Sequence, residues 1–305
     1  MKTLIVLTGP TAVGKTDLSI ELAQKLNCDI ISADSRQIYK ELKIGVARPS
    51  DNNLSIVKHY MIAEKSIHEY YSAGKYELEV IHILKNIFKT KSTAILTGGS
   101  GMYIDAVCKG IDALPDADPE IRKYLTQKLN NEGIESLRFD LRRLDPEHYE
   151  IVDLNNPKRV LRAVEICIQT GKTYTSFLLN KNKKRDFRIL KIGLKRDREK
   201  LYERINKRVD IMIEIGLIEE AKRLLKYKNL NSLNTVGYKE LFAYFEHKYN
   251  LSEAVRLIKR NTRRYAKRQM TWFNRDEDYI WFNPDDKQLI IEHTEKICKE
   301  NKPTT

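Results

Sequence analysis

The segment that most constrains the fold is Gly9-Pro-Thr-Ala-Val-Gly14-Lys15-Thr16. It follows an apolar stretch, Thr3–Thr8, and precedes a helical pattern over Lys15–Leu26. A Gly-rich loop that ends in Lys-Thr between a strand and a helix is typical of phosphate-binding loops, in which backbone amides and the helix N-terminus surround the anion. The segment therefore predicts an α/β fold that binds a diphosphate or triphosphate, with a chance Gly-rich turn as the alternative. In such a loop Lys15 neutralises phosphate charge, and the Thr16 hydroxyl is a ligand for Mg²⁺.

Further short apolar segments predict the other strands of the same sheet. They are Asp29–Ser32, His59–Ile62, Thr93–Thr97, Ile189–Leu194 and Tyr279–Phe282. Helical patterns alternate with the early strands. The pattern over Gly74–Phe88 has Leu78, Ile81, Leu84, Ile87 and Phe88 at helical spacing. Strand–helix alternation is typical of a parallel sheet that is covered by helices on both faces. We predict a P-loop NTPase-like parallel sheet flanked by helices.

A different pattern begins at Pro115. Asp118 is a candidate N-cap with Pro119 at the first helical position, and the chain up to the charged stretch at residues 181–186 shows helical patterns without a convincing strand. We therefore predict an all-helical insertion domain over residues 115–186. Residues 1–114 and 187–305 would form the α/β core, with basic helices at its C-terminal end.

Composition narrows the class of partner. The 55 Lys and Arg exceed the 42 Asp and Glu, so 55 − 42 gives a net charge of +13, and an anionic partner is expected. No apolar run approaches the ~20 residues of a membrane span, and the opening MKTLIVLT is too short for a secretory signal. The four cysteines lie far apart, which excludes a Cys-x-x-Cys metal or redox pair. We expect a cytoplasmic protein with mostly buried thiols and no membrane contact.

An acidic residue, Asp34, follows the second predicted strand. Carboxyl ends of parallel strands share one edge of a sheet, so Lys15, Thr16 and Asp34 are expected to converge there. Ser35, Arg36 and Gln37 extend this polar cluster, and a Gln amide is able to pair with an adenine edge. The alternative is that Asp34 only caps a helix over Ser35–Tyr39.

The strand Thr93–Thr97 departs from the usual ATPase pattern. A conventional ATPase has an acid at the end of such a strand to hold Mg²⁺. Here the strand leads into Gly98-Gly99-Ser100-Gly101, which contains no acid. The turn predicts a strand-to-helix junction on the ligand edge of the sheet, either functional or merely tight.

Residues 254–275 form a basic helical pattern with eight Lys or Arg and no acid. On a helical wheel, one half carries Arg256, Lys259, Arg260, Arg263, Arg264, Lys267 and Arg268, and the other half carries Leu251, Val255, Ile258, Tyr265 and Trp272. A merely solvated face normally includes acids, so the pattern favours contact with an RNA backbone. A smaller version at residues 156–170, with Lys158, Arg159 and Arg162, is equally compatible with a core helix.

Taken together, the motifs resemble the tRNA dimethylallyltransferases, also called tRNA isopentenyltransferases. The matching segments are GPTAVGKT, SADSRQIY, IGVARPS, LTGGSGMY, LPDADPEIR, NNPKRVLRAVEI, TVGYKEL and NTRRYAKRQMTWF. They cover nearly the whole chain and, apart from the phosphate loop, are specific to that family. The resemblance implies transfer of a dimethylallyl group from dimethylallyl diphosphate to N6 of adenosine 37, immediately 3′ of the anticodon in tRNA, with release of diphosphate.

The resemblance also implies roles for individual residues. The donor's diphosphate would bind Gly9, Pro10, Thr11, Ala12, Val13, Gly14, Lys15 and Thr16. Asp34 would be the general base, and Lys15, Thr16, Ser100 and Arg122 would complete the catalytic set, with Mg²⁺ on Thr16. The tRNA anticodon stem-loop would contact Asp34, Ser35, Arg36, Gln37, Ser100, Arg122, Lys158, Arg159, Val160, Leu161, Arg162, Arg260, Arg263, Arg264, Lys267 and Arg268. Ser100 stands where many members have Thr, and Met102 where Leu is more usual. We expect a monomer.

Three alternatives remain open at this point. A P-loop small-molecule kinase would share the loop and the core but would not need a basic helix. A nucleic-acid-binding module without catalysis would leave Gly9–Thr16 and Asp34 unexplained. An adenylate prenyltransferase of the cytokinin-forming type would use the same chemistry on a free nucleotide, without needing a large basic footprint.

Overall fold

The computed structural model of the protein describes residues 1–178 and 182–299. It divides into two compact units, the first made of Met1–Cys108 and Lys184–Thr305 and the second of Lys109–Lys183. The insertion was predicted at 115–186, so its limits differ from the second unit by six residues at the start and three at the end. Residues 179–181 and 300–305, which the predicted domain ranges include, lie outside the described residues.

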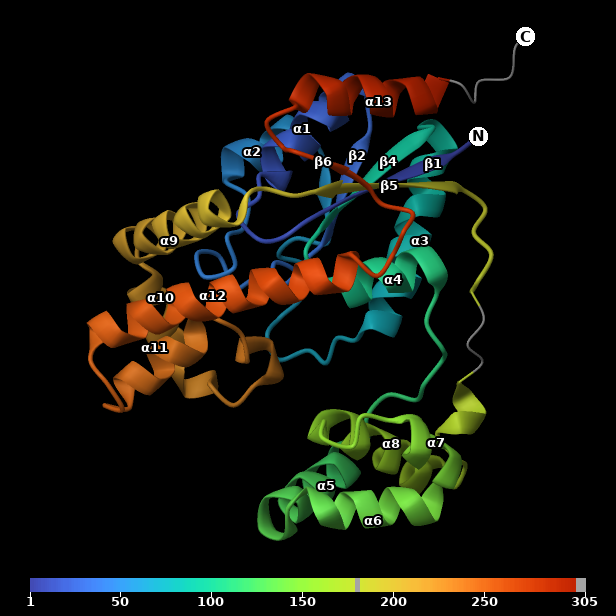
Figure 1. Cartoon of the computed structure of the whole chain (residues 1–305), viewed down its shortest axis with the longest axis vertical. Helices are drawn as coiled ribbons and strands as arrows, with labels where there is room; N and C mark the ends of the chain where they lie inside the picture. The colour runs from blue at the N-terminus through green and yellow to red at the C-terminus, as the bar shows by residue number, and fades with distance from the viewer. Residues whose placement is uncertain (179–181, 300–305) are drawn as a thin grey trace. The chain divides into compact units, whose positions relative to one another are not determined.

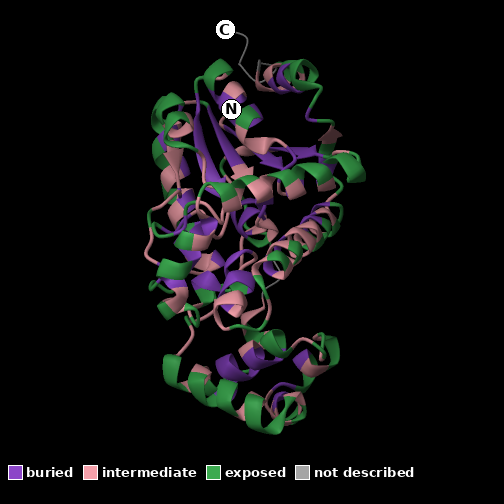
Figure 2. Cartoon of the chain, turned by 90° about the vertical axis from the view of Figure 1, so that its left-hand side faces the viewer, coloured by how far each residue is buried: buried purple, intermediate pink, exposed green. Residues whose placement is uncertain are grey.

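The first unit is built on a parallel sheet. In the described residues it has six strands in the order β3-β2-β4-β1-β5-β6. Their bounds are β1 (Thr3–Thr8), β2 (Asp29–Ala33), β3 (His59–Tyr60), β4 (Thr93–Gly98), β5 (Arg188–Leu194) and β6 (Ile280–Phe282). Every neighbouring pair is parallel, and β1 lies between β4 and β5 with Thr8 opposite Gly98 and Gly193. The predicted parallel sheet is confirmed, and its central strands are buried (Figure 2).

One predicted strand is shorter than expected. β3 stops at Tyr60 instead of Ile62 because Met61 takes a left-handed conformation with φ of 64°, which an extended strand cannot continue. The Met61 backbone N–H donates instead to the Glu64 carboxylate at 2.6 Å.

Helices cover both faces of the sheet (Figure 1). In the first unit they are α1 (Lys15–Lys25), α2 (Asp51–Ile56), α3 (Ala73–Thr90), α4 (Gly101–Lys109), α9 (Arg198–Glu214), α10 (Leu217–Leu224), α11 (Tyr238–Phe245), α12 (Leu251–Phe273) and α13 (Lys287–Lys299). Leu18 and Leu22 of α1 join Ile290 of α13 in one core cluster against the strands. The α3 and α4 helices lie on the opposite side in Figure 1. A sheet buried on both faces explains why its strands are continuously apolar.

The apolar stripe predicted for the α3 segment is only partly right. Leu84 and Ile87 are buried, but Leu78 is 71% exposed, and the stripe instead includes Tyr76 and Val80. Positions 76, 80, 84 and 87 follow the helical period, whereas residue 78 is rotated by about 200° from residue 76.

The second unit is all-helical. Its helices are α5 (Pro119–Glu132), α6 (Ile134–Leu144), α7 (Pro146–Ile151) and α8 (Pro157–Thr170), followed by a 3₁₀ turn at Thr175–Phe177. The predicted start of α5 is confirmed, since the Asp118 side chain accepts the backbone N–H groups of Glu120 and Ile121 with Pro119 at the first position. The core of this unit includes Leu137, Leu141 and Val164.

None of the helices within residues 1–178 and 182–299 combines the length and the apolar character that crossing a bilayer requires. The cysteines of the chain are unbridged. Cys28, Cys108 and Cys167 are buried and Cys298 is half-buried, as the wide spacing predicted.

Candidate active site

The phosphate loop connects β1 to α1 at the carboxyl edge of the sheet. Gly9 has φ of 143°, and a Cβ there would lie 2.6 Å from the carbonyl oxygen of Leu194 on β5. Gly14 has φ of 116° and is the N-cap of α1. Both positions require glycine because an L side chain rarely adopts these angles. The loop therefore turns tightly against β5 and presents the N-terminus of α1 to its interior, where the helix favours an anion.

Lys15 is folded back into this loop. Its Nζ donates to the carbonyl oxygens of Gly9 at 2.9 Å and Pro10 at 2.8 Å. Burial is the main cause that lowers the pKa of the Lys15 ammonium to about 7; the nearby Arg208 guanidinium adds to the shift, and Asp34 opposes it. Burial and a neighbouring cation both disfavour the charged form of Lys15. A phosphate anion bound in the loop would favour the charged form and would pair with it strongly.

Three arginines from the β5–α9 region donate hydrogen bonds to the loop. Arg196 donates from Nε to the carbonyl of Val13 at 3.2 Å, and Arg204 donates from Nε to the carbonyl of Ala12 at 2.8 Å. Arg208 reaches the Thr11 hydroxyl at 3.5 Å, and burial is the main cause that lowers its pKa. None of these three arginines was predicted as a site residue. The one signal was the spacing of Arg204 and Arg208, which lie one helical turn apart on the same face.

A cavity of about 160 Å³ opens above the loop and brings together Lys15, Thr16 and Asp34, as predicted. Its charged lining has three basic side chains, Lys15, Arg204 and Arg208, and two acidic ones, Asp17 and Asp34. Residues at the end of β4, Thr97, Gly98 and Gly99, complete the same wall. A lining with more basic than acidic side chains, in which Asp34 is one of the carboxylates, suits a site that holds an anion next to a group able to accept a proton.

Asp34 lies in a turn and not at the start of a helix. Residues 35–38 form turns that end at a bridge between Tyr39 and Lys65. The capping alternative is nevertheless partly right, because Asp34 Oδ1 accepts the backbone N–H groups of Arg36 at 2.9 Å and Gln37 at 3.2 Å. Both bonds are accepted by Oδ1, and they fix the carboxylate at the cavity wall. Oδ2 accepts neither of these two N–H groups.

Ser100 and Gln37 hold this turn in place. The Ser100 hydroxyl accepts the backbone N–H of Ser35 at 2.9 Å, which joins the β4–α4 loop to the Asp34 turn. The Gln37 amide donates to the carbonyls of Val46 and Ala47 at 3.1 Å each. Both N–H groups of that amide thus have protein partners, so pairing with an adenine edge would require their release. Arg36 donates to the carbonyls of Asn231 and Ser232.

Two residues of α12 belong to this site although sequence analysis assigned them no role in it. Tyr265, which we expected to pack in the core, lines the cavity. Burial, followed by the charge of Asp34, raises the pKa of its phenol, so the hydroxyl stays protonated. Gln269 is buried and accepts the Thr11 backbone N–H at 2.8 Å while it donates to the Gly99 carbonyl at 2.9 Å. No sequence pattern distinguished it, because the same helix carries other uncharged polar residues, Asn261, Thr262 and Thr271.

The buried carboxylate of Glu220 holds the loop that contains Val46 and Ala47. The Glu220 carboxylate of α10 accepts the consecutive backbone N–H groups of Lys43, Ile44 and Gly45, the last two at 2.9 Å. It also accepts the Tyr238 hydroxyl at 2.6 Å, and burial followed by this carboxylate raises the Tyr238 pKa. The cavity wall at Ala47 therefore depends on an anion that is only 3% exposed.

The outer face of α12 is less uniformly basic than the wheel predicted. Arg264, Lys267 and Arg268 are exposed. Lys259 instead pairs with Asp210 of α9 at 2.5 Å, and Arg263 donates to the Asn206 side chain at 2.7 Å. Arg256 pairs with Glu253, and Arg260 donates to Asn261. A helical wheel shows the residues of one helix only, so it could not show that Asp210 and Asn206 of α9 accept hydrogen bonds from α12.

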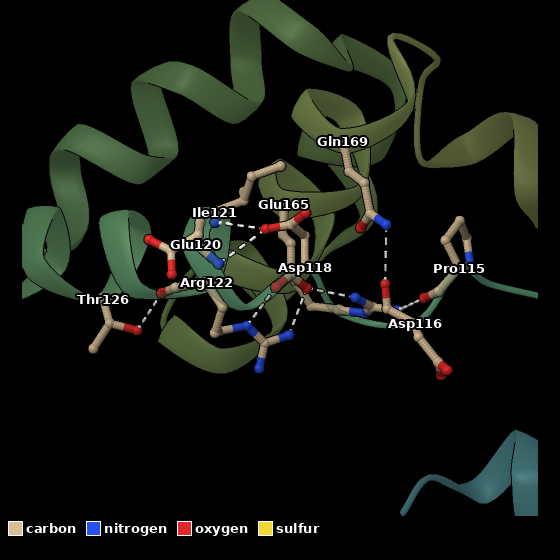
Figure 3. Close-up of polar contacts among 10 residues, drawn as sticks. Pro115, Asp116, Asp118, Glu120, Ile121, Arg122, Thr126, Glu165 and Gln169 are labelled. Atoms are coloured by element: carbon tan, nitrogen blue, oxygen red, sulfur yellow. Dashed lines mark hydrogen bonds and ion pairs between the residues drawn. The ribbon is translucent and has the colours of Figure 1, made fainter. Parts of the chain in front are cut away.

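The remaining predicted residues belong to the helical unit. Lys158 and Arg159 are exposed near the start of α8. The prediction of tRNA contact needs correction for Val160 and Leu161, whose side chains are 0% and 7% exposed and are part of that unit's core. Arg122 pairs with Glu165 (Figure 3), and so does Arg162.

Comparison with known proteins agrees with this architecture. The family model described as IPP transferase matches residues 37–276. A tRNA dimethylallyltransferase 1 of Bacteroides thetaiotaomicron is 55% identical over 96% of this chain and 95% of its own length. A tRNA isopentenylpyrophosphate transferase of Bacillus halodurans is 34% identical, with a TM-score of 0.73 over 98% of both chains.

A eukaryotic dimethylallyltransferase, solved in a study of its action on tRNA, has the same fold, with a TM-score of 0.83 over 100% of this chain and 81% of its own, at 24% identity. This chain therefore belongs to the IPP transferase family, the tRNA dimethylallyltransferases.

Proposed function

We propose that this enzyme transfers the dimethylallyl group of dimethylallyl diphosphate to N6 of adenosine 37 in the anticodon stem-loop of tRNA and releases diphosphate. The observation that carries the proposal is the shared cavity of the phosphate loop and Asp34. A carboxylate at the wall of the same cavity suits an acceptor that must lose a proton. The relatives' names point to the same reaction.

The leaving group is the first requirement of the reaction. Diphosphate departs from an allylic carbon as an anion, so the amides of the loop, Lys15 and Arg208 stabilise charge that grows in the transition state. Burial and then the Arg208 guanidinium lower the pKa of Lys15, and a bound diphosphate would favour its charged form. Removal of one such preorganised donor commonly costs about 3 kcal/mol of transition-state stabilisation.

The nucleophile is the second requirement. The lone pair of an adenine N6 amine is delocalised into the ring, so the amine attacks poorly unless its proton is accepted as the C–N bond forms. Asp34 accepts that proton, and its Oδ2 is the oxygen outside the two turn hydrogen bonds. Such general-base assistance is worth roughly 10²–10⁴ in rate. The bond between the prenyl carbon and the diphosphate oxygen breaks as the C–N bond forms.

Mg²⁺ fits the oxygen donors of this cavity. The described residues include no group of three or more His, Cys, Asp or Glu side chains that would hold a metal on their own. The Thr16 hydroxyl and the Asp34 carboxylate nevertheless line the same cavity as the phosphate loop. We propose that Thr16 holds Mg²⁺ together with oxygens of the diphosphate, where the ion would neutralise charge on the leaving group.

The tRNA would be recognised through phosphate contacts and an extruded base. Arg264, Lys267 and Arg268 of α12 and Lys158 and Arg159 of α8 are exposed cations suited to RNA phosphates. An anticodon-loop base is already unpaired, so its extrusion into the cavity costs only a few kcal/mol. We further propose that the enzyme works as a monomer in the cytoplasm, where tRNA is modified.

One assay tests the proposal against its alternatives. The protein is incubated with radiolabelled dimethylallyl diphosphate and Mg²⁺, with unmodified tRNA, AMP or ATP as acceptor. We expect label in tRNA alone, and nuclease digestion should place it at adenosine 37. Label in AMP or ATP without label in tRNA would instead establish an adenylate prenyltransferase. Phosphate transfer from γ-labelled ATP, with no prenyl transfer, would establish a kinase.

A further inference from the structure

A second cavity lies beside the phosphate loop in the first unit. Its volume is about 560 Å³, which is within the range of small-molecule sites. It shares Ala12, Ala47, Arg204 and Arg208 with the cavity above the phosphate loop, so the two cavities adjoin. We call it the outer cavity. The proposed reaction assigns it no ligand.

One stripe of α9 lines the outer cavity. Its six residues are Arg204, Lys207, Arg208, Ile211, Met212 and Ile215. They recur at helical spacings of three and four, so they lie along a single face of the helix and its C-cap. The three cations come first, and Arg204 donates to the Ala12 carbonyl of the phosphate loop at 2.8 Å. The stripe therefore has a cationic end next to the loop and an apolar end that reaches roughly 10 Å farther along α9.

The cationic end is rich in positive charge. The lining contains five Lys or Arg side chains, and none of the described residues in it is acidic. Lys43 pairs with Asp51 at 3.3 Å, whereas within residues 1–178 and 182–299 no acid forms an ion pair with Arg204, Lys207 or Arg208. Burial and then the charge of Arg204 lower the pKa of Arg208. An anion bound at this end would offset the repulsion between the cations.

The apolar end is exposed although it consists of large aliphatic side chains. Ile211 and Ile215 are 44% and 61% exposed. Ile44 adds to the apolar lining, and its backbone N–H donates to the buried Glu220 carboxylate at 2.9 Å. A Cβ on Gly216 would lie 3.8 Å from Cδ1 of Ile44, so this loop runs close to the end of α9. The wall is thus held in place before a ligand binds, which lowers the entropy cost of binding.

The two ends together suit an anionic ligand with an aliphatic chain. A guanidinium fork matches the oxygens of a phosphate or diphosphate, and the bond from Arg204 to Ala12 uses Nε and not this fork. The two isoleucines gain free energy when a hydrocarbon chain covers them. An RNA backbone phosphate would satisfy the cations but would leave the apolar end in water.

We propose that the outer cavity binds an isoprenoid diphosphate longer than dimethylallyl diphosphate, with its head group at the cationic end and its chain along Ile211 and Ile215. The choice of an isoprenoid chain rests on the proposed function, under which the prenyl donor belongs to the same chemical class. The bound ligand opposes donor binding, because Arg208 lines both cavities and two diphosphates beside one guanidinium repel each other. Longer isoprenoid diphosphates would therefore inhibit prenyl transfer.

Calorimetric titration of the full chain with farnesyl diphosphate tests the proposal. Ile211→Ser/Ile215→Ser removes the aliphatic groups of the apolar end. The matched control is Leu78→Ser/Leu289→Ser, which removes two aliphatic side chains that are 71% and 56% exposed on α3 and α13. We expect the first variant to bind farnesyl diphosphate roughly tenfold more weakly than wild type and the control to bind it equally well. Inorganic diphosphate, which has no chain, should bind equally to all three proteins.

The cationic end has a separate pair of variants. Lys207→Ala should weaken the binding of farnesyl diphosphate a few-fold, whereas Lys25→Ala, which removes an exposed lysine of α1, should not. In the tRNA prenylation assay, farnesyl diphosphate should raise the KM of wild type for dimethylallyl diphosphate. The same concentration should raise it much less in Ile211→Ser/Ile215→Ser.

Two results would overturn the proposal. One is equal affinity of wild type and Ile211→Ser/Ile215→Ser for farnesyl diphosphate. The other is binding of farnesyl diphosphate by wild type that is no tighter than its binding of inorganic diphosphate. If the double serine variant fails to fold, Lys207→Ala replaces it, because this side chain is exposed; wild-type affinity for farnesyl diphosphate would then refute the proposal.

Failure of this proposal is distinguishable from failure of the proposed function. Calorimetry requires neither tRNA nor turnover. Binding of farnesyl diphosphate at the outer cavity without any prenylation of tRNA would refute the proposed function alone. Normal prenylation of tRNA, together with farnesyl diphosphate binding that the isoleucine replacements leave unchanged, would refute only the role of the outer cavity.

Discussion

Gln269 accepts the backbone N–H of Thr11 at 2.8 Å, across 258 positions of the chain. The same amide donates to the carbonyl of Gly99, so one buried side chain of α12 joins the phosphate loop to the end of β4. The helix whose exposed cations we propose as RNA contacts is therefore also bonded to the loop that we expect to hold the prenyl donor.

Replacement of Gln269 should loosen the donor site. Gln269→Ala leaves the Thr11 N–H and the Gly99 carbonyl without this partner, and an unsatisfied buried group costs about 1–3 kcal/mol. We expect a lower melting temperature and a higher KM for dimethylallyl diphosphate. Gln288→Ala, in which the lost amide is exposed on α13, is the matched control and should change neither quantity. A Gln269→Ala enzyme with wild-type KM and melting temperature would contradict the bridging role.

Donor binding should take up a proton above neutral pH. Lys15 has a pKa of about 7 in the free protein, so it is mostly neutral at pH 8, and a bound diphosphate favours its charged form. Affinity should therefore fall as pH rises above about 7, until the pKa of the bound state is reached. Calorimetry at pH 8 in buffers of different ionisation enthalpy should report uptake of close to one proton per donor.

Lys15→Arg is the control for that titration. Arginine stays charged at pH 8, so the variant should bind the donor without this proton uptake. If wild type and Lys15→Arg showed the same proton uptake, the proton would bind to a group other than Lys15.

The lowered pKa of Lys15 also affects folding. Because the charged form of Lys15 is disfavoured in the folded protein, the free energy of unfolding should rise between pH 7 and about 10.

Asp34→Asn should separate chemistry from folding. The asparagine carbonyl is still able to accept the N–H groups of Arg36 and Gln37, so the turn is kept while the base is lost. We expect kcat to fall by roughly 10²–10⁴, with the affinity for tRNA changed only a few-fold. Single-turnover prenylation and stem-loop binding give the two quantities. A variant with near-normal turnover would exclude Asp34 as the base.

The three exposed cations of α12 should contribute to the salt dependence of RNA binding. Replacement of Arg264, Lys267 and Arg268 by Ala should weaken stem-loop binding and lower the salt slope by about 2–3. The control replaces three exposed lysines of α1 and α3, Lys25, Lys85 and Lys89, which removes the same charge. Equal losses in both triple variants would mean that net charge, and not the α12 surface, attracts the RNA.

Glu220→Gln should destabilise the wall of the cavity. The Ile44 N–H donates to one carboxylate oxygen and the Gly45 N–H to the other, so the amide nitrogen that replaces either oxygen faces one of these backbone donors. We expect a loss of about 1–3 kcal/mol in the free energy of unfolding. Urea denaturation measures this loss. Glu219→Gln, the neighbouring residue of α10, should unfold like wild type. A Glu220→Gln protein of unchanged stability would show that the loop does not need this acid.

Local pattern was sufficient for much of the fold and of the candidate site. The Gly-rich loop between an apolar strand and a helical pattern predicted β1 and α1, and the short apolar runs predicted the other strands. Asp34 was found because parallel strands end at one edge of the sheet, which brings their following residues together. The predicted β3 was two residues too long. The strand ends because Met61 takes a left-handed conformation, and nothing in the sequence indicates this conformation at a residue other than glycine.

Other parts of the site needed the tertiary structure. Arg204, Arg208, Tyr265 and Gln269 reach the cavity from helices that follow the phosphate loop by about 190 residues or more, and no periodicity specifies such contacts. The pairing of Lys259 with Asp210 likewise depends on how α9 and α12 pack. Sequence by itself determined the strand segments, the phosphate loop and the acid that follows β2, because these are patterns of residues close together in the chain. Tertiary packing alone decided which distant side chains brace the site, because their positions are set by the core that all the helices share.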